Sequence, residues 1–149
     1  MGQASTVKYL GDLSTEMVHI DSGDRIHTDA PKDNAGKGEG FSPTDLVATS
    51  LASCMITTMG IKARQHEIDL VGTHADVVKE MSANPRRISA IRINIYFPHN
   101  YNNKNKKILE HIAHSCPVGR SLHIDIEEDI TFHYPVLKRL AVELPMTGY

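Results

Sequence analysis

The feature that most constrains the fold is a long apolar helix pattern in the first half of the chain. Ser42 is a suitable N-cap, Pro43 suits the first helical position, and Asp45 can complete a capping box. Apolar and small side chains then recur at helical spacing to about Gln65, which predicts a helix of roughly 35 Å. Its small residues would let another helix approach closely: Ala48, Ser50, Ala52 and Ser53. We therefore expect a central, buried helix that begins at Pro43.

The segment before this helix favours β-structure. Three short alternating or β-branched segments are separated by turn residues, and they predict a three-stranded meander over residues 5–10, 16–20 and 24–28. Residues 30–40 are rich in glycine and charged residues, and their apolar residues follow neither the helical nor the strand spacing. We expect a loop there.

After the central helix the pattern returns to strands. Alternation predicts strands over 68–81 and 88–97, and an amphipathic helix over 102–115. Pro117 stops that helix, 127–134 reads as a final strand, and the tail after Pro135 has weak helical character. This order predicts an α+β fold with mainly antiparallel pairing. At 149 residues, the whole chain 1–149 has the size of a single domain.

Charge and composition exclude several classes of partner. The chain has 16 basic and 18 acidic side chains spread along its length, so no field favours nucleic acid or an anionic membrane. We see no signal peptide and no apolar run near the roughly 20 residues of a membrane span. A cytoplasmic protein is expected. Its two cysteines would then be free, redox-active or metal-binding rather than a permanent disulfide.

The two cysteines differ in their local sequence. Cys54 lies about three turns inside the central helix, too far from its start for the helix dipole to lower the thiol pKa much. The simplest interpretation of Cys54 is a buried structural cysteine. Cys116 stands where one helix stops and another can begin, with Arg120 nearby, so a lowered pKa is expected more readily there. Either thiol could be the attacking one.

Two motifs carry a resemblance to a known family. The segment from Ser42 to Cys54, SPTDLVATSLASC, resembles the central helix of the OsmC/Ohr family, and His114 to Arg120, HSCPVGR, resembles its second-cysteine motif. The resemblance covers nearly the whole chain. It implies an intertwined homodimer in which long central helices pack together behind six-stranded antiparallel sheets, with active sites at the subunit interface. No cofactor is expected.

The same resemblance implies a peroxidase activity. Cys54 would attack an organic hydroperoxide and become a sulfenic acid, and Cys116 would condense with it to a disulfide. An external dithiol, such as a lipoyl protein, would then restore both thiols. The family glutamate ten residues before the first cysteine is replaced by Thr44, so Asp45 is the expected substitute. Arg25 is the expected substitute for the family arginine, although it also reads as an exposed strand residue.

Three other functions stay open at this level. A metal site could combine His111, His114 and Cys116 with Cys54 as a fourth ligand. A Cys-His pair could act on an acyl or glycosyl substrate, although no oxyanion-hole motif is readable. The third alternative is a non-catalytic dimer that binds a small thiol, lipid or sulfur compound, or acts as a redox sensor.

Overall fold

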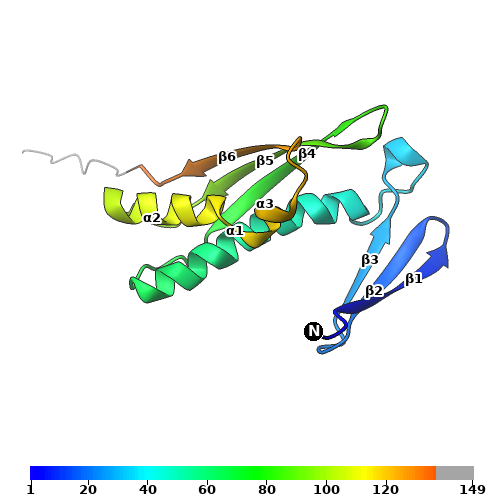
Figure 1. Cartoon of the computed structure of the whole chain (residues 1–149), viewed down its shortest axis with the longest axis horizontal. Helices are drawn as coiled ribbons and strands as arrows, with labels where there is room; N and C mark the ends of the chain where they lie inside the picture. Colours follow the sequence, from blue (N-terminus) through cyan, green and yellow to red (C-terminus); the bar gives the residue numbers. More distant parts are fainter. Residues whose placement is uncertain (137–149) are drawn as a thin grey trace, which may run out of the picture.

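The protein has two sheets and three α-helices in the residues described by the computed structural model, 1–136. The elements are β1 (Ser5–Gly11), β2 (Ser14–His19), β3 (Arg25–Asp29), the 3-10 helix η1 (Lys32–Asn34), α1 (Pro43–Gln65), β4 (His74–Ser82), β5 (Arg87–Tyr96), α2 (Asn103–His114), α3 (Pro117–Ser121) and β6 (Glu127–His133). One sheet has the order β1-β2-β3 and the other β4-β5-β6 (Figure 1). The α+β class is confirmed. The helical tail expected after Pro135 lies, beyond residue 136, outside the described residues.

Helix α1 begins and ends where its sequence predicts. The Ser42 hydroxyl accepts a hydrogen bond from the Asp45 amide at 3.1 Å, and the Asp45 carboxylate accepts one from the Ser42 amide at 3.0 Å. Pro43 follows the cap at the first helical position. These bonds satisfy amide groups that the first helical turn leaves without a partner, so local sequence is enough to set this boundary.

The second sheet differs from the prediction in one pairing. Strands β4 and β5 are antiparallel, as expected, but β6 runs parallel to β5. The expectation of antiparallel pairing is wrong for β6, because α2 and α3 lie between the two strands and return the chain to the end where β5 began. Strand β4 also begins at His74 rather than at residue 68, since Glu67 and Gly72 have positive φ angles of 55° and 96° that interrupt an extended chain.

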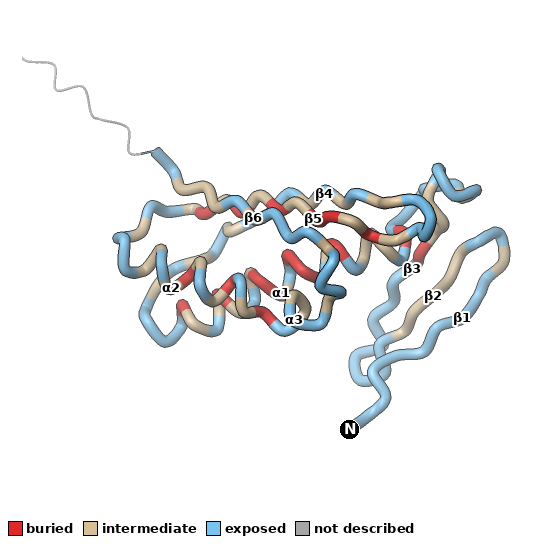
Figure 2. Tube along the Cα trace, turned by 45° about the horizontal axis from the view of Figure 1, so that its top comes forward, coloured by how far each residue is buried: buried red, intermediate tan, exposed pale blue. Residues whose placement is uncertain are grey.

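The core lies between the second sheet and helices α1 and α2. Figure 2 shows buried positions along α1, α2 and β5, and the second sheet covers both helices. The buried side chains come from facing elements: Leu51, Met55 and Met59 of α1, Ile91, Ile93 and Ile95 of β5, and Leu109 and Ala113 of α2. This core fixes α1 as the central helix of the chain.

The first sheet stands apart from that core. In Figure 1 it projects from the start of α1, and its apolar side chains Val7, Tyr9 and Ile26 are exposed. Its main tie to the rest is the bridge between Thr28 and Phe41, just before α1. A three-stranded sheet needs its apolar face packed against another surface to be stable. In the single chain the apolar side chains of the first sheet have no such cover.

Helix α1 has the predicted length but resembles a membrane span more than expected. By length and composition alone, its 23 residues could cross a membrane, with a mean hydropathy of 1.4 over 18 residues. The expectation that no apolar run approaches that length is therefore wrong. The contacts of α1 with α2, α3, β4 and β5 place it as a core helix of this fold.

Candidate functional site

Cys54 lies in the middle of α1 and is partly exposed. Its sulfur is 3.9 Å from the Thr58 hydroxyl one turn later, and that hydroxyl donates to the Cys54 carbonyl at 2.7 Å. The thiol therefore combines a fixed position on a packed helix with access from solvent.

Cys116 is the N-cap of α3 and is fully buried. Its sulfur accepts a hydrogen bond from the Gly119 amide at 3.4 Å, and Pro117 occupies the first helical position. The Cys-Pro pair at this helix start thus serves two purposes, because the sulfur replaces the oxygen of an ordinary cap while the proline supplies the helical φ angle.

The fold brings these two cysteines into direct contact. Both are free thiols, and Cys54 is among the groups close enough to Cys116 to act on its ionisation. The contact forms because α3 packs against α1 in the core (Figure 1). Two segments that are distant in the sequence therefore supply one dithiol site.

The environment of Cys116 is the opposite of the one expected. Burial is the main cause that raises the pKa of this thiol, and although the Gly119 amide opposes it, the hydrogen bond with Cys54 and the charge of Glu128 raise it further. The predicted lowering by Arg120 is wrong because that side chain is exposed at the surface. Burial and these neighbours thus favour the protonated form of the Cys116 thiol.

Glu128 is a site residue that the sequence analysis missed. Its carboxylate oxygen Oε1 lies 3.1 Å from the place where a Cβ of Gly119 would stand. The residue is exposed at the edge of the sheet, and partial desolvation of its carboxylate raises the pKa of Glu128, while His114 opposes that shift. The signal was present in the sequence, because Glu128 interrupts an alternating apolar row formed with Ile130 and Phe132.

Asp45 is engaged at the start of α1 and not at the thiols. It completes the cap of Ser42 and forms an ion pair with Lys79 at 2.8 Å. Burial acts to raise the pKa of Asp45, but hydrogen bonds from Lys79 and Ser42 outweigh it and lower the pKa below the ordinary value. Asp45 lies about two and a half turns before Cys54, so one chain does not bring the two together.

Arg25 lies on β3 in the first sheet, where its guanidinium pairs with Glu16 at 2.7 Å. The pair is on the exposed surface of that sheet. Within the described chain Arg25 is not placed at the thiols, and its catalytic role stays a prediction.

The possible metal ligands do not converge. Among residues 1–136 there is no group of three or more His, Cys, Asp or Glu side chains arranged to hold a metal ion. The ring of His114 instead packs edge-on against Phe132, with centroids 5.7 Å apart.

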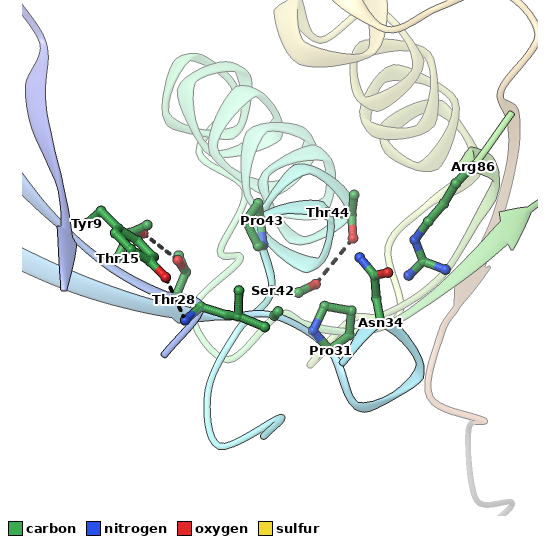
Figure 3. A pocket seen from close by; sticks show the side chains of 11 residues that line it. Tyr9, Thr15, Thr28, Pro31, Asn34, Ser42, Pro43, Thr44 and Arg86 are labelled. Atoms are coloured by element: carbon green, nitrogen blue, oxygen red, sulfur yellow. Dashed lines mark hydrogen bonds between the residues drawn. The ribbon is translucent and has the colours of Figure 1, made fainter. Parts of the chain in front are cut away.

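A separate cavity of about 320 Å³ lies at the start of α1 (Figure 3). Its walls come from the first sheet, the loop with η1, the cap of α1 and the turn between β4 and β5. Figure 3 shows Arg86 directed toward Asn34 at one side and Tyr9, Thr15 and Thr28 at the other. Neither cysteine lines it, so this cavity and the dithiol are distinct features of one chain.

Comparisons with known proteins agree with this geometry. The family model described as OsmC-like protein matches residues 36–129. The structure of a proposed osmotic stress induced and detoxification response protein from Psychrobacter arcticus is 52% identical, with 89% of this chain and 97% of that chain covered and a TM-score of 0.87. A comparison with the curated proteins found no match.

More distant structures share the fold. The organic hydroperoxide resistance protein OsmC from Legionella pneumophila is 16% identical, with 89% and 98% of the two chains covered and a TM-score of 0.70. The organic hydroperoxide resistance protein OhrB of Bacillus subtilis is 15% identical, with 88% and 98% covered and a TM-score of 0.61. At these identities the likeness establishes the architecture alone.

Proposed function

This chain belongs to the OsmC-like protein family, and we propose that it reduces organic hydroperoxides with Cys54 and Cys116. The observation that carries the proposal is the contact between a partly exposed thiol and a fully buried one. A peroxide from solvent can meet the partly exposed Cys54, whereas Cys116 is fully buried. This difference in exposure supports the first attack by Cys54 and resolution by Cys116.

The proposed cycle has three steps. The Cys54 thiolate attacks the terminal oxygen of the hydroperoxide, the O–O bond breaks, and the alkoxide leaves as an alcohol after taking a proton. The Cys116 sulfur then attacks the Cys54 sulfenic acid, an S–S bond forms, and the hydroxide leaves as water with the thiol proton of Cys116. An external dithiol, such as a lipoyl protein, reduces the disulfide and is itself oxidised.

A homodimer is part of this proposal. Val47 and Ile61 lie on an exposed side of α1, and the apolar faces of the first sheet are open in one chain. Packing two α1 helices and covering both sheets would bury these surfaces. Asp45 and Arg25 would then act only across the interface, because neither reaches the thiols of its own chain. We expect this dimer to work in the cytoplasm, where dithiol reductants are available.

The direct test is the mass and thiol content of the reduced protein before and after one equivalent of cumene hydroperoxide. The proposal expects both thiols to disappear within seconds as one intrachain disulfide. Dihydrolipoamide or dithiothreitol should then restore them. Thiols that survive the peroxide unchanged would rule out a peroxidase.

The cavity in Figure 3 favours a second function, which is the binding of a small thiol, lipid or sulfur compound. Its volume suits a small ligand, and Arg86 offers a charged contact beside a mostly apolar wall. Calorimetry with a short-chain fatty acid would test it in the variant that lacks both cysteines. Binding that persists there and is lost on Arg86→Gln would support this function, while absence of binding would exclude it for that ligand class.

A further inference from the structure

Glu128 is a charged residue on the same face of β6 as apolar residues. The outward side chains of β6 are polar and engaged, with Glu127 and Asp129 reaching Arg92 at 3.5 and 2.8 Å. The inward side chains Ile130 and Phe132 pack against the core. Glu128 shares their face at the exposed end of the strand, so its carboxylate stands at the solvent-accessible edge of an apolar row that points toward the helices.

Gly119 explains how the carboxylate fits there. The position where its Cβ would stand is 3.1 Å from Glu128 Oε1 and 3.5 Å from Cys116 Sγ. The missing side chain therefore leaves a space that the carboxylate and the thiol border together. The Gly119 amide also donates to the Cys116 sulfur, which fixes the thiol at this point.

The titratable neighbours of Cys116 come from three elements. Cys54 of α1 is in contact with it, Glu128 of β6 stands across Gly119, and His114 of α2 acts on Glu128. Arg120 of α3 and Glu128 are both exposed residues, but of the two only Glu128 is among the charges that act on Cys116. The charge that faces the buried thiol from the sheet side is thus a carboxylate. A negative charge beside a thiol opposes its ionisation.

We propose that Glu128 is a positioning residue whose carboxylate, across Gly119 from Cys116, opposes ionisation of that thiol and so keeps it for the resolving step. The inference rests on the proposed function, because the resolving role of Cys116 comes from the proposed peroxidase cycle. The Cys116 proton stays in place until the S–S bond forms, when it leaves with the hydroxide from Cys54 as water. Burial, which is the largest influence, and the neighbouring Cys54 act in the same direction as Glu128.

The test is the pH titration of Cys116, followed by the ultraviolet absorbance of its thiolate. The protein carries Cys54→Ser, so Cys116 is the remaining thiol, and the same titration of the variant lacking both cysteines is subtracted. Glu128→Gln is added to this background and compared with Glu127→Gln, the adjacent carboxylate that faces Arg92 on the other side of the sheet. We expect Glu128→Gln to raise the thiolate fraction at a given pH roughly threefold to tenfold, and Glu127→Gln to leave it unchanged. Glu128→Asp keeps the charge, so the titration midpoint of Cys116 in this variant should lie between those of the parent and Glu128→Gln.

The inference would be overturned if Cys116 had the same titration midpoint in Glu128→Gln and in its parent. It would also be overturned if Glu127→Gln shifted that midpoint by the same amount. No peroxide is used, so the result is independent of the proposed activity. A shifted midpoint in a protein that ignores peroxide would reject the peroxidase alone. An unshifted midpoint in an active peroxidase would reject the role of Glu128 alone.

Discussion

Cys54 in the middle of α1 and Cys116 at the N-cap of α3 are neighbours where α3 packs on α1, and Cys54 is partly exposed while Cys116 is fully buried. Two chemically identical groups are thus made unequal by burial. The proposed order of reaction depends on this inequality.

Replacing either cysteine should separate the two steps. We expect Cys54→Ser to abolish rapid peroxide consumption, because the buried Cys116 cannot meet the substrate. Cys116→Ser should still react once and stop with one added oxygen on Cys54, detected by intact mass and by a sulfenic-acid reagent. The exposed neighbour Ser53→Ala serves as the control. Peroxide consumption that survives in Cys54→Ser would contradict the assignment.

A side chain at Gly119 should disturb the dithiol site. The Cβ of Gly119→Ala would stand 3.1 Å from Glu128 Oε1 and 3.5 Å from Cys116 Sγ, so the carboxylate or α3 must shift. Because the crowded atom is the far end of an exposed, flexible side chain, we expect a loss of at most about 1 kcal/mol in the free energy of unfolding, and slower disulfide formation after peroxide. Gly60→Ala in α1 is the matched control, because its Cβ meets nothing within 4 Å. That control should stabilise the chain by about 0.5–1 kcal/mol. Equal effects of the two variants on unfolding would refute the packing argument.

Asp45 should contribute stability that depends on pH. Its pKa is lowered in the folded protein from the ordinary value of 3.8, so the folded state favours the ionised carboxylate. As the pH falls below 3.8, the unfolded chain takes up the proton first, and the stability due to Asp45 is lost as the pH passes through the folded pKa. Asp45→Asn should therefore lower the free energy of unfolding at neutral pH and have little effect in strong acid. Denaturant unfolding at both pH values measures this. A deficit of the same size in strong acid would show that the carboxylate charge is not the cause.

A variant of Arg25 tests whether this residue takes the role of the arginine that the family resemblance implies. Its exposed pair with Glu16 contributes about 0–1 kcal/mol, so Arg25→Gln should leave unfolding nearly unchanged. A role across the proposed dimer interface predicts slower oxidation of Cys54 by peroxide in this variant, measured by stopped-flow loss of thiol. Lys8→Gln, on the neighbouring part of the first sheet, is the control. An unchanged rate in Arg25→Gln would leave Arg25 as a surface residue of β3.

Leu51 should be important for the stability of the site as well as the core. It is fully buried on α1, and its Cδ1 lies 3.5 Å from the Gly119 Cβ position, where α3 meets α1. We expect Leu51→Ala to cost about 2–5 kcal/mol. Val47→Ala on the same helix is the comparison, because Val47 is exposed and lies outside this core. In the monomeric protein this variant should lose much less free energy of unfolding. Similar losses for both in a protein shown to be monomeric would argue against the observed packing.

Much of the fold was predictable because it depends on local chemistry. The meander of β1 to β3 follows from alternation interrupted by turn residues, and the start of α1 follows from the Ser42, Pro43 and Asp45 cap. The direction of β6 was not predictable in the same way. It depends on how α2 and α3 cross the sheet, and no residue within β6 records that path.

The same division applies to the candidate site. The sequence by itself determined which residues could be a dithiol pair, that Cys54 lies inside a helix and that Cys116 stands where one helix stops and another begins, because capping and periodicity act over a few residues. Only the tertiary structure decided that Cys54 and Cys116 touch, that Cys116 is buried with its pKa raised instead of lowered, and that Glu128 stands beside it. Burial and the approach of charges from separate elements are properties of the packed chain, so no local pattern could supply them.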